Sequence, residues 1–332
     1  MDGAIITTYR CNAKCHMCHT WKYPSKRDEE IGLELIKKLP GNLDHLNITG
    51  GEPMLRNDIE DIVDVVSSKA RCIEVSTNGY FTDRIVRLAE KFPFLKIRVS
   101  VEGLPALNDI LRGPKNGFDH ALRTILELKR CNIKDIGFSF VVSDKNIPDL
   151  LNLYYLCASM GIEFTNAPMH NSFYFHKHDN KLDDVDNTVR ELKKFIIAML
   201  GSPRSSLRMK VKDWLRAYYN IGIISYISGK QPLLAGCPAG RDMFFLSPFG
   251  DILPCNASAE PWIMGNLKEK SFHEIWNSLQ AIEIRKKIEI CNRNCWMMGC
   301  ARGKMRRNPL PIINWILINK YRLAFKIPPT FL

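Results

Sequence analysis

Residues 9–19 read Tyr-Arg-Cys-Asn-Ala-Lys-Cys-His-Met-Cys-His and place three thiols within eight residues, directly after the first predicted β-strand. Cys11, Cys15 and Cys18 at this spacing are typical of a site-differentiated iron–sulfur cluster. Three thiolates ligate only three of the four irons of a cubane cluster, so the fourth iron keeps an open position for a small molecule. The two histidines of the same stretch leave a tetrahedral zinc site as the alternative on this segment alone.

A second motif, Thr49-Gly50-Gly51-Glu52-Pro53, follows the apolar run from Leu46 to Ile48 at the end of another predicted strand. Glycines let a ligand approach the backbone closely, and a glutamate is an acceptor for an ammonium group. Together the two motifs resemble the radical S-adenosylmethionine (radical SAM) superfamily, in which a Cys-x3-Cys-x2-Cys cluster site is followed by Gly-Gly-Glu-Pro. The resemblance favours iron over zinc and implies that S-adenosyl-L-methionine binds at the open iron.

Composition predicts a globular protein with one large domain and one small one. The chain has 332 residues, of which 45% are hydrophobic and 25% charged, as is ordinary for an enzyme with a substantial core. No long apolar stretch precedes Cys11, so we expect no secretory signal and a cytoplasmic location. The net charge of +12 suits an anionic membrane surface or a phosphorylated substrate. Nucleic acid is not expected as a partner, because no nucleic-acid-binding module is recognisable.

The eleven cysteines fall into two spaced sets and three single residues. Clustered cysteines in a cytosolic chain favour metal binding over disulfides. Cys72, Cys131 and Cys157 stand alone in apolar surroundings, and we expect them to be buried packing thiols.

Short β-rich runs alternate with helical patterns over the first half of the chain. The six predicted strands are Ile5–Tyr9, Leu46–Thr49, Cys72–Thr77, Lys96–Val101, Ile136–Val142 and Glu163–Ala167. Alternation of this kind predicts a parallel α/β sheet with right-handed crossovers and sites at the carboxyl ends of the strands. The resemblance implies a partial (β/α)6 TIM-like barrel that is open on one side.

Four parts of the chain are expected. Residues 1–205 would form the radical SAM barrel, 206–232 a helical connector, 233–308 a small domain with a β-hairpin and helices, and 309–332 a basic amphipathic tail. The tail mixes apolar residues and a tryptophan with Lys320, Arg322 and Lys326, so it would either lie in a membrane interface or pack back on the barrel.

The positions after the predicted strands form one polar constellation. By the resemblance, Gly50, Gly51 and Glu52 would receive the methionine amino group, Ser100 and Glu102 would contact ribose or carboxylate, and Arg112 would pair with the cofactor carboxylate. For any of these residues taken singly, a turn or cap role is an equal alternative. The full set expected at the cofactor is Met17, Gly50, Gly51, Glu52, Pro53, Ser76, Asn78, Ser100, Glu102 and Arg112.

The second cysteine set comprises Cys237, Cys255, Cys291, Cys295 and Cys300. A hairpin turn signal at Gly250-Asp251 precedes Cys255. The set resembles a SPASM or shortened twitch extension, and its five thiols suffice for one auxiliary four-iron cluster. Cys237, Cys255, Cys291 and Cys295 are the first choice of ligands, with Cys300 as an alternative to either Cys291 or Cys295. The fifth thiol would be a packing cysteine or a hydrogen-atom donor to a substrate radical. A zinc ribbon is the competing interpretation.

The loop after the sixth predicted strand is rich in histidine and aromatic residues, as expected at a barrel mouth. His170, Asn171 and Tyr174 are therefore candidate substrate contacts, and His170 and Tyr174 are grouped with Cys300 as candidate catalytic residues.

The function expected from the resemblance is reductive cleavage of S-adenosylmethionine to a 5′-deoxyadenosyl radical, followed by hydrogen abstraction and oxidation or epimerisation of the substrate. Only ten residues precede Cys11, which leaves no room for a peptide-binding module and favours a sugar or glycoconjugate, lipid-linked or phosphorylated. A peptide-modifying enzyme is the alternative, and a zinc-stapled binding protein is the alternative of another class. A flavodoxin- or ferredoxin-type electron donor and peripheral contact with the inner face of the membrane complete the expected partners.

Overall fold

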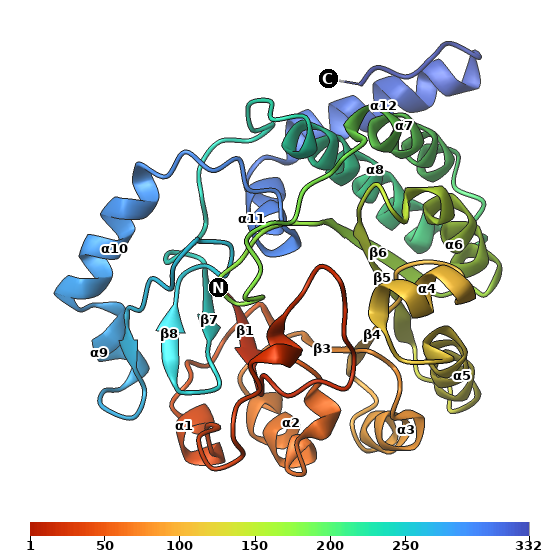
Figure 1. Cartoon of the computed structure of the whole chain (residues 1–332). Coiled ribbons are helices and arrows are strands. Elements are labelled where there is room, and N and C mark those ends of the chain that lie inside the picture. Colours follow the sequence, from red (N-terminus) through yellow and green to blue (C-terminus); the bar gives the residue numbers. More distant parts are fainter. Residues whose placement is uncertain (332) are drawn as a thin grey trace.

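The computed structural model describes residues 1–331, and a nine-stranded sheet forms its centre (Figure 1). Six neighbouring strands pair in parallel, in the order β6-β5-β4-β3-β2-β1. They span Asp2–Ile6 (β1), His45–Thr49 (β2), Ile73–Thr77 (β3), Lys96–Ser100 (β4), Asp135–Val142 (β5) and Glu163–Pro168 (β6). The predicted partial barrel is confirmed.

The first strand is shifted from its prediction, because it ends at Ile6 and not at Tyr9. The amide of Tyr9 donates to the Ser25 hydroxyl, and the amide of Arg10 donates to the Thr8 hydroxyl. Side chains therefore take the hydrogen bonds that a neighbouring strand would have supplied, and the chain leaves the sheet before the first cysteine.

The sheet continues beyond the six predicted strands. β7 (Met243–Leu246) pairs in parallel with β1, and antiparallel β8 (Asp251–Leu253) and β9 (Gly265–Asn266) follow it. The hairpin predicted at Gly250-Asp251 is present. Its first strand belongs to the barrel sheet, so the elements that carry the second cysteine set are anchored to β1.

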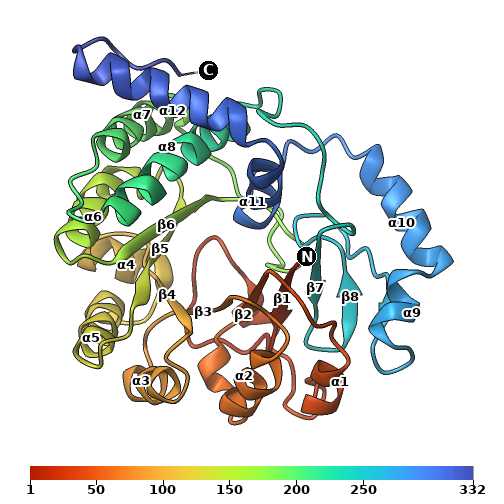
Figure 2. The ribbon, with the colours of Figure 1, turned by 180° about the vertical axis from the view of Figure 1, so that it is seen from behind.

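Helices cover the convex side of the sheet, with α2, α3, α5 and α6 outside the strands (Figures 1 and 2). The helices before β7 are α1 (Leu33–Lys37), α2 (Ile59–Ser67), α3 (Thr82–Lys91), α4 (Pro105–Arg112), α5 (Gly117–Arg130), α6 (Ile147–Ser159), α7 (Val185–Gly201) and α8 (Leu207–Ile227). After the hairpin come α9 (Phe272–Trp276), α10 (Leu279–Glu289), α11 (Met298–Arg307) and α12 (Pro309–Ala324). None of the helices within residues 1–331 is both long enough and apolar enough to cross a bilayer.

The two faces of the sheet differ in polarity. Leu46, Val75, Val99 and Phe138 belong to the buried core with the helices, as period-two alternation requires. The opposite face carries half-buried polar side chains on β2 to β6: Asn47, Ser76, Ser100, Ser139 and Thr165. The concave side of the barrel is therefore a polar surface that suits a hydrophilic ligand.

An ion-pair network fills the concave side toward the start of the strands. Arg98 of β4 pairs with Asp135 at 2.5 Å, and Lys212 and Arg216 of α8 both pair with Glu163 of β6. Burial opposes ionisation of Glu163, but Arg216 and Lys212 outweigh it and lower its pKa to about 2. The network ties α8 to the last barrel strand.

One tryptophan joins α8 to the second cysteine set. Trp296 is buried, donates from Nε1 to the carbonyl of Tyr219 at 2.7 Å, and stacks on the Tyr219 ring. The indole lies directly over Gly222, where a Cβ atom would overlap it. The glycine within α8 is thus required by the close approach of Trp296.

Two of the three single cysteines differ from their prediction. Cys157 is buried, but Cys72 and Cys131 are half-exposed, and the Cys131 thiol interacts with Glu90 at 3.2 Å. Cys131 lies at the C-terminal end of α5, where the chain turns at the surface, so its apolar neighbours in sequence do not bury it.

Gly222→Ala is predicted to lower the free energy of unfolding by at least ~2 kcal/mol, because the added methyl group overpacks the site of Trp296. Urea unfolding of both proteins, followed by circular dichroism, measures the change. Gly201→Ala is the matched control: apart from the neighbouring backbone of its own helix, no atom lies within 4 Å of its Cβ position, so its stability should hold or rise. Equal stability of the Gly222 variant and the wild type would contradict the packing described.

Candidate iron–sulfur and cofactor site

The cysteine loop after β1 is held from several sides. The amides of Lys14 and His16 donate to the carbonyls of Arg112 and Leu111 at the end of α4. The side chain of Asn78 donates to that of Asn12 at 2.6 Å. These contacts come from the end of α4 and from the residue after β3, so the loop has a defined conformation around its thiols.

The thiols of the first set have partners typical of cluster ligands. The Cys11 sulfur accepts from the amide of Ala13 at 3.4 Å, and the Cys18 sulfur lies 3.0 Å from the Thr20 hydroxyl. Burial raises the pKa of Cys11 to about 12 and that of Cys15 to about 11. Buried thiols near one another fit a cluster, because ligation by iron replaces the protons that burial otherwise keeps on sulfur.

Gly50 and Gly51 pack against the chain that leads into the cysteine loop. The amide of Gly51 donates to the carbonyl of Thr8 at 2.7 Å, and the amide of Glu52 donates to that of Arg10 at 2.9 Å. A Cβ atom on Gly51 would overlap the carbonyl of Arg10. These glycines therefore let two segments of the protein's own backbone lie close together.

Glu52 is fully buried and accepts three hydrogen bonds. They come from the Thr77 hydroxyl at 2.7 Å, the Asn78 amide at 2.7 Å and the Met54 amide at 3.1 Å. The last bond makes Glu52 the N-cap of the short 3-10 helix Pro53–Leu55 (η2). A carboxylate accepts about four hydrogen bonds, so one position is left for an ammonium donor.

Glu102 and Arg112 form a buried ion pair beside the thiols, at 3.2 Å. The second Glu102 oxygen accepts from the amide of Val141 at 2.8 Å. Burial raises the pKa of Glu102 to about 7, although Arg112 opposes this. Arg112 also interacts electrostatically with Glu52, so two buried carboxylates share one guanidinium. The ammonium group of a ligand would balance the charge of the second carboxylate. The amino-acid end of S-adenosylmethionine carries such a group.

The other residues expected at the cofactor lie around the same end of the barrel. Ser76 donates to Asn47 at 3.0 Å on the concave face, and Met17 is buried with its carbonyl bonded to Asn180. Ser100 is half-buried at the end of β4, and no side-chain partner for it is found among residues 1–331. Its hydroxyl is open to a ligand.

The second cysteine set gathers around the hairpin and α11. The thiols of Cys237 and Cys300 interact directly, and Cys255 lies within electrostatic reach of Cys237 and Cys291. Cys295 interacts in the same way with Cys237, Cys255 and Cys291. All five thiols thus share one region, with Cys300 buried and Cys237 and Cys291 exposed.

No group of three or more histidine, cysteine or acidic side chains within residues 1–331 converges on a single ion. In a cubane cluster each thiolate binds a different iron, so its ligands stand further apart than those of one metal ion.

One segment after β6 touches the surroundings of both cysteine sets. On one side the amide of His19 donates to the carbonyl of Phe175 at 2.8 Å, and the Thr20 hydroxyl donates to the carbonyl of Tyr174 at 3.2 Å. On the other side the amide of Phe173 donates to the carbonyl of Ser258 at 3.2 Å, and the Ser172 hydroxyl donates to the carbonyl of Asn256. We call residues 172–175 the bridging segment.

Comparison with known proteins places both sets in recognised domains. Residues 5–154 match the radical SAM superfamily, and residues 237–300 match the SPASM iron–sulfur cluster-binding domain. The chain belongs to the radical SAM superfamily. Members with this second domain use S-adenosylmethionine and four-iron clusters, so the cofactors expected from the sequence are confirmed.

Curated relatives cover most of this radical SAM chain. Mycofactocin maturase MftC of Mycolicibacterium smegmatis is 27% identical over 81% of this chain and 68% of its own. Pre-heme d1 synthase of Dinoroseobacter shibae is 25% identical over 81% of this chain and 71% of its own. Native anSMEcpe with bound AdoMet and Cp18Cys peptide shares the fold, with a TM-score of 0.63 at 16% identity over 95% of this chain and 98% of its own.

The residues expected to contact substrate have internal partners in this radical SAM protein. The Tyr174 hydroxyl donates to the carbonyl of Gly50 at 2.6 Å, and Asn171 exchanges hydrogen bonds with Asn180. His170 packs on Phe175 and its Nε2 atom is buried without a partner among residues 1–331. Burial lowers the pKa of His170 to about 4, so the ring is neutral near pH 7. Of these three candidate contacts, His170 is the one with a polar side-chain atom, Nε2, that has no hydrogen-bond partner within residues 1–331.

Sequence reasoning missed the residues that hold the loop in place. Glu30 is almost fully buried and binds Arg10 through both oxygens, at 2.9 Å each, and it also pairs with Arg56 at 3.3 Å. Glu30 stands in a charged run that resembles a solvated surface. The signal available was the arginine directly before Cys11, which needs a partner if the loop is buried.

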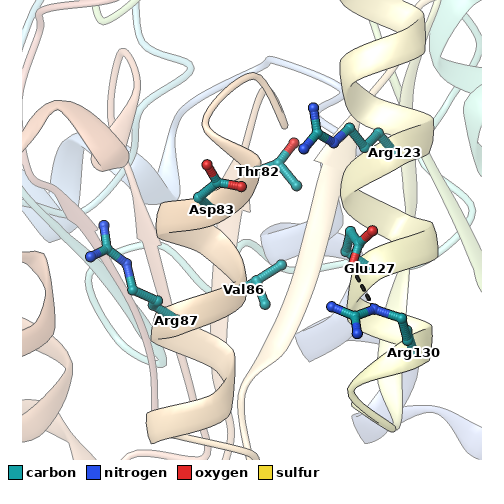
Figure 3. Close-up of a pocket in the computed structure, with 7 residues that line it drawn as sticks. All are labelled: Thr82, Asp83, Val86, Arg87, Arg123, Glu127 and Arg130. Atoms are coloured by element: carbon teal, nitrogen blue, oxygen red, sulfur yellow. Dashed lines mark hydrogen bonds and ion pairs between the residues drawn. The ribbon is translucent and has the colours of Figure 1, made fainter.

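A shallow surface cavity of about 570 Å³ lies between α3 and α5, and none of the eight cysteines of the two sets lines it (Figure 3). Its lining mixes Arg87, Arg123 and Arg130 with Asp83 and Glu127. Glu127 already pairs with Arg130 at 2.7 Å, and we assign the cavity no part in the site.

Tyr174→Phe is predicted to destabilise the protein by about 1–2 kcal/mol, because the carbonyl of Gly50 loses the hydrogen bond from the buried Tyr174 side chain. Urea unfolding measures the change. Tyr23→Phe is the control, since Tyr23 is 56% exposed. If Tyr174 is instead a substrate contact only, its variant will unfold like the wild type while turnover falls.

Proposed function

We propose that this radical SAM enzyme modifies a peptide, as a maturase does. The observation that carries the proposal is the similarity to mycofactocin maturase, which extends over 81% of this chain. The fold shared with anSMEcpe, which holds a peptide together with AdoMet, supports a barrel mouth of suitable shape. The polar concave face of the sheet suits the amide groups of a peptide.

Cys11, Cys15 and Cys18 would hold the first cluster. Glu52 and Arg112 would hold the two ends of the methionine part of the cofactor, and the open hydroxyl of Ser100 and the carboxylate of Glu102 would orient it further. Met17, Pro53, Ser76 and Asn78 would complete the cofactor site. When bound, S-adenosylmethionine supplies a carbon radical that removes a hydrogen atom from the substrate.

The protein's own residues would position the substrate and keep water away. The bridging segment lies between the two cysteine sets, so a substrate bound against it would reach both. The Nδ1 atom of the neutral His170 ring donates to the carbonyl of Pro168 at 3.3 Å, so its Nε2 atom would accept one hydrogen bond from that substrate. The electron donor of flavodoxin or ferredoxin type and the four-part domain division remain predictions.

A sugar substrate was expected because few residues precede Cys11, and the relatives do not support it. The similarity to pre-heme d1 synthase favours a second candidate, a tetrapyrrole substrate.

The substrate test uses anaerobically reconstituted protein with peptides encoded by short reading frames next to its gene. The expected result is that one peptide stimulates 5′-deoxyadenosine formation at least about ten-fold and changes in mass, with two hydrogens lost on oxidation or solvent deuterium gained on epimerisation. Stimulation by a tetrapyrrole or a sugar, and by none of the peptides, would overturn the peptide assignment while leaving the enzyme class intact.

The ligands of the auxiliary cluster can be separated by two single variants. Cys237, Cys255 and Cys295 lie together, and either Cys291 or Cys300 completes the set. The burial of Cys300 and its contact with Cys237 favour Cys300, so Cys300→Ala should lose about four irons per chain. Cys291→Ala is the matched control and should retain them; the reverse result makes Cys291 the ligand and leaves Cys300 as the spare thiol.

A further inference from the structure

The C-terminal helix α12 has one face that is packed and one that is not. Ile312, Trp315, Ile316 and Asn319 are buried against α7 and α8, where Trp315 meets the ring of Tyr218 at 5.6 Å. The spacing of three and four residues puts these side chains on one side of the helix. Packing on the helix layer, which was one of two expectations for this tail, is therefore present.

The opposite side of α12 is apolar and exposed at the outer edge of the molecule (Figures 1 and 2). We call it the α12 face, and it consists of Leu310, Ile313, Leu317, Ile318 and Tyr321, followed beyond the helix end by Phe325. Leu310 is 77% exposed, Leu317 63% and Tyr321 60%. Their spacing of three or four residues forms one continuous stripe, about 24 Å long for a helix of 16 residues.

The start of α8 adds a second exposed apolar stripe. Leu207, Val211 and Leu215 recur every four residues and are 68%, 41% and 39% exposed. Trp315 contacts Tyr218, and the Lys320 ammonium group lies 4.3 Å from the centre of the Trp214 ring. The two helices therefore run antiparallel, and the α8 stripe lies toward the C-terminal end of the α12 face. Exposed apolar side chains gathered on two neighbouring helices are typical of an interaction site.

The charges around the α12 face are of one sign. No acidic residue follows Glu289 in the sequence. Lys320 and Arg322 flank the stripe on its two sides, and Lys326 is exposed just beyond it. Burial and the neighbouring Lys210 lower the pKa of Lys320, which places a further cation close by. Lys320 donates to the carbonyl of Leu200 at 3.2 Å and Arg322 donates to the carbonyl of Pro328 at 2.7 Å. None of the three cations has a carboxylate partner within residues 1–331, so their positive charge is not neutralised.

Another exposed helix shows that this arrangement is not a general property of the chain. On α10, Leu279 is 80% exposed and Ile282 is 42% exposed. That helix also carries Glu283 and Glu289 among its lysines, so its surface charge is mixed. Of these two exposed helices, α12 combines a continuous apolar stripe with cations alone, and α10 does not.

We propose that the α12 face and the adjoining stripe of α8 dock the protein on an anionic phospholipid bilayer. The helix would lie in the plane of the membrane surface, with its apolar stripe at the acyl boundary and Tyr321 and Phe325 at the level of the headgroups. Lys320, Arg322 and Lys326 would contact the lipid phosphates. A neutral protein partner would use the stripe and leave the flanking cations unmatched.

The test measures co-sedimentation of the reconstituted holoprotein with vesicles of phosphatidylcholine containing about 30 mol% phosphatidylglycerol. We expect binding that weakens at high salt and in vesicles of phosphatidylcholine alone. Leu317→Glu/Tyr321→Glu should reduce the partition coefficient at least about ten-fold, and Lys326→Glu should reduce it about five-fold or more. All three positions are exposed, so the fold and the rate of S-adenosylmethionine cleavage should not change.

Leu279→Glu and Lys286→Glu on α10 are the matched controls, because they make the same changes on another exposed helix. Both should bind vesicles like the wild type. The proposal is overturned if the wild type does not bind these vesicles, or if the α10 variants lose as much binding as the α12 variants. It is also overturned if the wild type forms a dimer that the α12 variants abolish and shows no vesicle binding.

Discussion

The approach of Gly50–Glu52 to the backbone of Thr8–Arg10 is the constraint on which the site depends. Two amide-to-carbonyl hydrogen bonds join these segments, and a side chain at Gly51 would push them apart. The contact sets the cysteine loop beside the buried carboxylate of Glu52. The Tyr174 hydroxyl also stabilises Gly50 by donating to its carbonyl. Cluster loop, cofactor motif and bridging segment are thereby fixed by one local arrangement of the backbone.

The concave side of the barrel is polar, and ion pairs fill it toward the start of the strands. Toward the start of the strands, Arg98, Lys212 and Arg216 neutralise the acidic residues of the concave face and attach α8. Toward the strand ends, hydroxyl and amide groups remain half-buried and accessible to a ligand. Because β7 pairs with β1, the second cysteine set is carried on the same sheet as the first. The two cysteine sets therefore share one scaffold.

The strands, the hairpin and both cysteine sets could be predicted from the sequence, because the alternation of strands with helices and the spacing of cysteines are local signals. Contacts between residues that are distant in the sequence could not be predicted. Glu30 resembled a surface charge, yet it is buried with Arg10 and Arg56. Tyr174 resembled an open substrate contact, yet its hydroxyl is bonded to Gly50. The continuation of the sheet through β7 also depends on a pairing across about 240 residues, which no local pattern encodes.

The central claim is that two separate iron–sulfur clusters serve one substrate site, and that only the first binds S-adenosylmethionine. Electron paramagnetic resonance of the dithionite-reduced protein, with and without S-adenosylmethionine, tests it most directly. The account predicts two signals, of which one shifts when S-adenosylmethionine is added and is missing in Cys11→Ala/Cys15→Ala/Cys18→Ala, while the other persists unchanged. A single signal, two signals that both ignore S-adenosylmethionine, or a protein that contains zinc without iron would contradict it.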